Sequence, residues 1–126
     1  MMKGLLAPQH PAASAEHRKH EHIHILLVEP DEEQREDTRL ELRQAGYQVA
    51  AAEDAVVAGH RILEHAPDLV LCRADMPYMS GAEFAAALQA DPTLPRMAVL
   101  VLEKPLVRDE LLETVARELE LYGRPR

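Results

Sequence analysis

The stretch PDLVLCRADMPYMSG, residues 67–81, decides how this chain folds. It begins with a short aliphatic run, Leu69 to Cys72, of the kind that forms a buried parallel strand. Arg73 follows the run directly, and a turn around Pro77 leads to Ser80, a residue type that caps helices. The stretch therefore predicts a strand, an ordered loop and the start of a helix.

The same alternation of strand and helix continues on both sides of this stretch. Aliphatic runs of four to six residues predict strands, and longer segments without proline predict helices. In chain order, the expected elements are a strand at 23–28, a helix at 31–45, a strand at 47–52, a helix at 54–65, a strand at 69–72, a helix at 82–90, a strand at 98–102 and a helix at 109–121. Such an order indicates an α/β fold with a parallel sheet.

Residue types at the helix ends and on the helix faces make this prediction more specific. Asp54 and Ser80 are expected to cap helices, and Gly46 is expected to end one. Apolar residues predict the buried faces: Leu40, Leu42 and Ala45 in the first helix; Val57, Ile62 and Leu63 in the second; Leu111, Leu112, Val115, Ala116 and Leu119 in the last.

Composition limits the class of protein. The chain has 126 residues, enough for one core, and a formal net charge of −8, which disfavours nucleic-acid binding. Its single cysteine, Cys72, fits a reducing cytoplasm, and no apolar run is long enough to span a membrane. We expect a flexible, His-rich tail at 1–21, one domain at 22–122 and a short tail at 123–126.

Several motifs occur in a fixed order along the chain. They are ILLVEPD at 25–31, AGYQV at 45–49, PDLVLCRADMPYMSG at 67–81, the segment from Asp91 to Leu102, and Lys104-Pro105. Together they resemble the receiver domain of bacterial response regulators over residues 23–121. The resemblance implies a flavodoxin-like (CheY-like) three-layer sandwich with a four-stranded parallel sheet of order 2-1-3-4.

The positions that carry the chemistry of that family are altered here. Arg73 stands at the phosphoacceptor position, and a guanidinium has no nucleophilic oxygen for the aspartyl route. Glu103 stands at the switch position, where the family has Thr or Ser. The resemblance thus implies a degenerate phosphorylation pocket without a catalytic residue, made of Glu29, Pro30, Asp31, Arg73, Glu103 and Lys104.

Arg73 has a simple structural interpretation within this pocket. The family holds Mg²⁺ with a pair of carboxylates, but the corresponding positions here are Glu29 and Pro30, followed by Asp31. We expect Arg73 to take the place of the cation and to form an ion pair with Glu29 or Asp31.

A deletion beside the pocket changes the sheet. Glu103, Lys104 and Pro105 follow directly after the fourth strand, whereas the family has a helix and a fifth strand between the switch residue and its Lys-Pro pair. Two units could be the missing one: the family's fourth strand with the helix that follows it, or that helix with the fifth strand. In both cases a four-stranded sheet results. If the fifth strand is the one missing, the apolar fourth strand becomes a sheet edge, which invites pairing with another chain. This interaction edge consists of Ala98, Val99, Leu100, Val101 and Leu102.

We therefore predict a cytoplasmic, non-enzymatic protein-interaction module of a two-component phosphorelay, independent of phosphorylation and of any cofactor. Its partners would be a second copy in a homodimer, or a sensor kinase or regulatory protein, with neither nucleic acid nor membrane. A monomer whose edge is shielded by the tail is the alternative.

Two other functions stay open. One is a divergent phosphoacceptor that uses Asp75 or Asp31. The other is a metal or anion sensor that uses the pocket of Arg73 and Lys104, or the histidines near the amino terminus. The weak candidates for metal ligands are His17, His20, His22 and His24.

Overall fold

A computed structural model describes residues 20–122 of the chain, and these form one α/β unit. Strands and helices alternate throughout. Their bounds are β1 (His24–Val28), α3 (Glu32–Gln44), β2 (Gln48–Ala52), α4 (Ala55–Glu64), β3 (Leu69–Arg73), α5 (Gly81–Ala90), β4 (Ala98–Leu102) and α6 (Arg108–Tyr122). The elements predicted from the sequence are all present, and no predicted end differs from the observed one by more than one residue.

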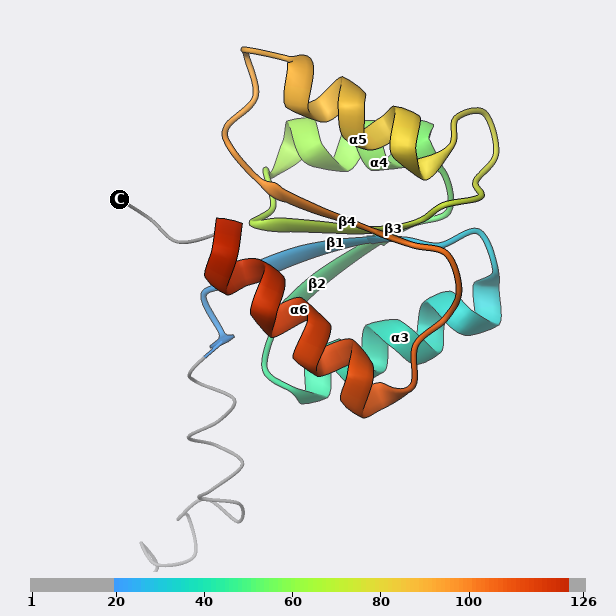
Figure 1. The fold of residues 1–126 in the computed structure, drawn as a ribbon, viewed down its shortest axis with the longest axis vertical. Helices are drawn as coiled ribbons and strands as arrows, with labels where there is room; N and C mark the ends of the chain where they lie inside the picture. Colours follow the sequence, from blue (N-terminus) through green and yellow to red (C-terminus); the bar gives the residue numbers. More distant parts are fainter. Residues whose placement is uncertain (1–19, 123–126) are drawn as a thin grey trace, which may run out of the picture.

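The four strands form a parallel sheet in the order β2-β1-β3-β4, which confirms the predicted topology. Helices α4 and α5 cover one face of the sheet, and α3 and α6 cover the other (Figure 1). β2 and β4 are the two edges. None of the helices in residues 20–122 is both long and apolar enough to cross a membrane.

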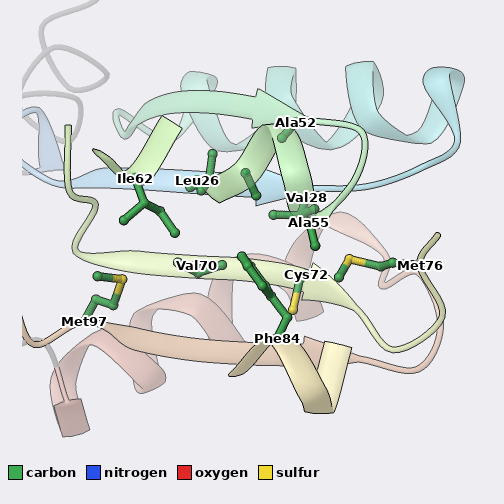
Figure 2. Close-up of a cluster of buried hydrophobic side chains, with 11 residues drawn as sticks. Leu26, Val28, Ala52, Ala55, Ile62, Val70, Cys72, Met76, Phe84 and Met97 are labelled. Atoms are coloured by element: carbon green, nitrogen blue, oxygen red, sulfur yellow. The ribbon is translucent and has the colours of Figure 1, made fainter. Parts of the chain in front are cut away.

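Each face of the sheet has its own hydrophobic core. The core under α4 and α5 includes Cys72, which lies beside the ring of Phe84 (Figure 2). Burial raises the pKa of the Cys72 thiol to about 11, so the side chain is a neutral, packed group at physiological pH. The core under α3 and α6 is built around Leu42, Leu111 and Val115.

Local sequence signals fix where the helices begin and end. Asp31 and Asp54 each accept a hydrogen bond from the backbone N–H three residues later, at 2.9 Å, and so cap α3 and α4. Ser80 and Glu83 form a reciprocal capping box at the start of α5. Gly46, with φ of 105°, ends α3 in the left-handed conformation that favours glycine.

Three residues that were predicted to be buried are exposed, so these predictions are wrong. Leu63 is 78% exposed and Leu40 is 44% exposed, and Ala116 is exposed as well. In α4 the sheet is contacted by Ala58 and Ile62, which lie four residues apart. Leu63 is one position further along, about 100° around the helix, and therefore points away from the sheet.

The predicted tails and the described residues overlap only at residues 20 and 21. Residues 1–19 and 123–126, which include most of the predicted tails, lie outside the described part of the chain. His20 and Glu21 do contact the sheet: the His20 ring stacks on Tyr47 at 4.5 Å, and the Glu21 carbonyl accepts a hydrogen bond from Gln48.

Gly81 lies in close contact with the ends of β3 and β4. A Cβ atom at this position would lie 2.3 Å from the Arg73 carbonyl oxygen and 2.9 Å from Cγ1 of Val101. The absence of a side chain therefore allows the first turn of α5 to approach the ends of both strands.

Two alanine substitutions are expected to have opposite effects. Gly81→Ala should lower the free energy of unfolding by about 2 kcal/mol, because backbone cannot move aside cheaply. Gly59→Ala, in the middle of α4 with no atom within 4 Å of the new Cβ, should raise it by about 0.5–1 kcal/mol. Urea denaturation measures both, and a loss of stability in Gly59→Ala would contradict this view of the two glycines.

Candidate functional site

The candidate site lies at the carboxyl ends of the central strands. β1 leads into Glu29, β3 ends at Arg73, and β4 leads into Glu103. Because parallel strands end at the same edge of a sheet, the topology brings these three residues together from distant parts of the sequence.

The Arg73 guanidinium is at the centre of this site. Its Nη1 donates to Oε1 of Glu29 at 2.9 Å and to the side-chain oxygen of Gln34 at 3.1 Å. Its Nε and Nη2 donate to the backbone carbonyls of Leu102 and Glu103, both at 3.4 Å. One side chain thus joins β1, β3, β4 and the first turn of α3.

Glu29 is the acid that this cation neutralises. It is 5% exposed, and it is the buried charged residue of the described chain. Its second oxygen, Oε2, accepts the backbone N–H of Asp31 at 3.0 Å, and its carbonyl accepts from Arg35 at 2.8 Å. A buried carboxylate needs such partners, because an unpaired charge in the interior is costly.

The other predicted pocket residues have peripheral positions. Asp31 is exposed and caps α3 through Gln34, so of the two acids proposed for Arg73, the ion pair uses Glu29. Glu103 contributes its carbonyl, while its side chain and that of Lys104 are exposed. Asp75 is exposed in the loop after β3.

Gln34 is a site residue that the sequence argument missed. Its oxygen is the second side-chain acceptor for Arg73, and its backbone N–H is capped by Asp31. The available signal was position: the third residue after a helix cap lies in the first turn, which in this topology faces the ends of the strands.

Little empty space is left beneath the guanidinium. A cavity of about 20 Å³ lies there, between Glu29, Arg73 and the apolar residues Leu71, Leu102 and Leu106. This volume holds about one water molecule. Among the described residues, the side chains around Arg73 therefore leave room for about one water molecule in this cavity.

The histidines form a separate feature at the opposite end of the strands. The ring of His24 packs edge-on against the ring of His65, with centroids 4.3 Å apart. His17 lies outside the described residues, and His22 is exposed. Within residues 20–122, no group of three or more His, Cys, Asp or Glu side chains is arranged to hold a metal ion.

The loop between β3 and α5 shows an aromatic residue in an unusual conformation. Tyr78 has φ of 74°, in the left-handed region, and its side chain is 81% exposed. The loop is held on either side by Met76, which is buried, and by Met79, which packs on the same core. The loop is therefore anchored while Tyr78 faces solvent.

Comparison with known proteins agrees with this architecture. Residues 25–116 match the family described as the response regulator receiver domain. The chain belongs to that family. The receiver domain is the part of a response regulator that takes part in two-component signalling, and the four strands and their order agree with that assignment.

Curated and solved relatives support the same conclusion. The receiver domain is similar to response regulator MprA from Mycobacterium sp. (strain KMS), with 35% identity over 94 residues; these cover 75% of this chain and 39% of that protein. The chain thus matches about two fifths of the relative's length. The receiver domain of a signal transduction histidine kinase from Syntrophus aciditrophicus has the same fold, with a TM-score of 0.72 and 23% identity, covering 82% of this chain and 94% of that one.

Another relative allows a test of metal binding. The receiver domain of sensor histidine kinase PA1611 from Pseudomonas aeruginosa PAO1 carries a magnesium ion in its active-site cleft; it has a TM-score of 0.69 and 21% identity, covering 78% of this chain and 98% of that one. The residues of the present receiver domain do not fit Mg²⁺. Both Glu29 oxygens are engaged, Pro30 has no side-chain ligand, and Arg73 adds a positive charge.

The ion pair predicts a large coupling energy. Arg73→Met should lower the free energy of unfolding by about 2–3 kcal/mol, because it leaves the Glu29 carboxylate buried without its cation. Glu29→Gln combined with Arg73→Met should cost less than the sum of the two single changes, by more than about 1 kcal/mol. Urea denaturation of all four proteins measures this coupling.

The exposed pair of Arg39 and Glu36 is the matched control for this cycle. Arg39→Met should leave the urea midpoint almost unchanged, because solvent screens exposed charges. Equal effects of Arg73→Met and Arg39→Met would show that the Arg73 pair is not special.

The conformation of Tyr78 predicts a stabilising substitution. Tyr78→Gly should raise the free energy of unfolding by about 0.5–1 kcal/mol, since the left-handed region costs a non-glycine residue about 1–2 kcal/mol and glycine loses part of that gain through chain entropy. Tyr78→Ala, which keeps the strain and removes only an exposed ring, should change stability little. A destabilised Tyr78→Gly variant in thermal unfolding would contradict this prediction.

Proposed function

We propose that this receiver domain works as a phosphorylation-independent protein-interaction module, without catalytic activity of its own. The observation that carries the proposal is the position of Arg73: its guanidinium is held by Glu29 at 2.9 Å at the end of β3, and the motif around it resembles the family's phosphoacceptor motif with arginine in the acceptor position. A cation at that point supplies no nucleophile for phosphoryl transfer.

Further contacts support the loss of the switch. The family's switch position is Glu103, whose carbonyl already accepts a hydrogen bond from Arg73 while its side chain points to solvent. Lys104 is retained in sequence and exposed. The site therefore resembles one fixed state of a switch in which a side chain does the electrostatic work of a metal ion.

The sheet edge offers a surface for a partner. β4 is terminal in the sheet, and after Ala98 its side chains are only half-buried. We infer that the loss of one helix–strand unit exposed this strand, and that another protein chain binds there. A net charge of −8 and a buried free cysteine fit a cytoplasmic protein that binds protein rather than nucleic acid.

The alternative functions have less support. A displaced acceptor at Asp31 conflicts with its use as the cap of α3, and Asp75 belongs to no group of three or more metal-ligating side chains within residues 20–122. An anion at Arg73 would have to displace Glu29, whose carboxylate is already bound.

Phosphoryl transfer provides the direct test. The full chain is incubated with acetyl phosphate and Mg²⁺, and its intact mass is then measured at neutral pH. We expect no change in mass, because the acceptor position carries a guanidinium. A receiver domain with aspartate at the acceptor position, treated in parallel, is the positive control.

One result would refute the proposal. It is a mass increase of one phosphoryl group that persists at neutral pH and disappears after alkaline treatment, as an acyl phosphate would. Repeating the reaction with Asp75→Asn and Asp31→Asn would then locate the modified residue.

A further inference from the structure

The open edge of β4 has a defined set of free backbone groups. The N–H of Ala98 donates to the carbonyl of Asp68 at 3.0 Å, and the carbonyl of Leu102 accepts from Ala74 at 2.8 Å. Together with the parallel register to β3, these bonds direct the backbone groups of Ala98, Leu100 and Leu102 toward β3. The alternate residues, Val99 and Val101, must therefore direct their N–H and C=O groups outward.

Side chains alternate on the same strand. Val99 and Val101 pack on the core under α4 and α5, while Leu100 and Leu102 pack on the core under α3 and α6. All four are half-buried, so both faces of the edge strand expose part of their apolar surface. β4 also lacks the charged residues, prolines and bulges with which sheet edges usually prevent pairing.

We propose that a second copy of this chain pairs with β4 in antiparallel orientation, about a two-fold axis that passes between the two Leu100 residues. This inference rests on the proposed interaction role and names its partner. Val99 pairs with Val101 of the second copy, and Val101 pairs with its Val99. Each pair exchanges two hydrogen bonds, as the narrow pairs of an antiparallel ladder do.

The register follows from the geometry of the strand. Only residues whose backbone groups point outward can form hydrogen-bonded pairs with a second copy. In β4 these residues are Val99 and Val101. A two-fold axis at Leu100 uses both and joins two four-stranded sheets into one continuous sheet. Since residues opposite each other share a face, apolar side chains meet apolar side chains on both faces.

The charges at the ends of β4 contribute little to this pairing. Arg96 precedes the strand and Glu103 follows it, and both side chains are exposed. In this register Arg96 of each copy lies opposite Lys104 of the other, and Glu103 lies one position away, opposite Met97. The repulsion between Arg96 and Lys104 offsets the attraction between Arg96 and Glu103, and all of these groups are exposed, so the backbone and apolar contacts provide the affinity.

The flanking helices leave this edge approachable. α5 lies above β4 and α6 lies below it, and the strand itself runs between them along the side of the molecule (Figure 1). In a symmetric pair, the same helices of the two copies would lie side by side on each face and extend the contact beyond the strands. Such extension is needed because stable interfaces bury more surface than one strand pair provides.

Sedimentation of the full chain tests the proposal with two matched variants. We expect the wild type to shift from monomer to dimer between about 1 µM and about 1 mM, the range of weak to moderate association. Val99→Pro removes an outward N–H from the β4 edge, a position where proline leaves the fold intact. It should weaken dimerisation at least tenfold.

Val49→Pro is the control on the opposite edge. Gln48 and Ala52 direct their backbone groups to β1, so Val49 also points its N–H outward, from β2. Val49→Pro should therefore dimerise as the wild type does. A wild type that stays monomeric up to about 1 mM, or a dimer that Val49→Pro abolishes and Val99→Pro keeps, would overturn the proposal.

Cysteine cross-linking tests the register independently of affinity. The two residues at the two-fold axis lie opposite each other without sharing backbone hydrogen bonds. Their Cα atoms are about 4.5 Å apart in such a pair, within the range of a disulfide. Leu100→Cys should therefore form a disulfide-linked dimer on mild oxidation. Leu102→Cys should not, because its counterpart would lie four residues away, about 13 Å along the strand.

A cross-link at residue 102 but not at residue 100 would overturn the register. Native Cys72 is buried and should stay reduced in both variants. The phosphoryl-transfer experiment does not depend on oligomeric state. A monomer that accepts no phosphoryl group would overturn the second copy as partner and leave the phosphorylation-independent function in place.

Discussion

The ion pair of Arg73 and Glu29 stabilises the edge of the sheet at which the parallel strands end. In its family, that end of the sheet concentrates acidic groups that need a cation. Here the cation belongs to the chain itself and is delivered by β3, with its Nη1 2.9 Å from the carboxylate. Because Glu29 is nearly inaccessible to solvent, the fold requires this pairing at all times, whereas a metal ion could come and go.

The Arg73 side chain also connects the candidate site to the open edge of the sheet at β4. Arg73 also binds the carbonyls of Leu102 and Glu103, which follow one another at the end of β4. It thereby fixes the strand whose outer side is open. The Arg73 site and the open edge of β4 are therefore joined by direct hydrogen bonds, and under the proposed function both serve one role: a fixed site that holds a strand available to another chain.

Much of the fold could be predicted from local sequence because local chemistry sets it. The caps at Asp31, Asp54 and Ser80 each act over three residues, and the bounds of β4 follow from one uninterrupted apolar run. Errors arose where orientation mattered more than composition. Leu63 is as apolar as Ile62, but only the latter lies on the side of α4 that faces the sheet.

The sequence by itself determined that an arginine stands at the end of the third strand, that strands and helices alternate, and that four strands are found within residues 20–122, since these depend on residue types in order. Only the tertiary structure decided which acid pairs with Arg73, that Gln34 joins the pair, and which backbone groups of β4 face outward. Those depend on distances between segments far apart in the chain. Glu29 lies beside Arg73 because parallel strands end together, and the backbone groups of Val99 point outward because those of Ala98 bond to β3.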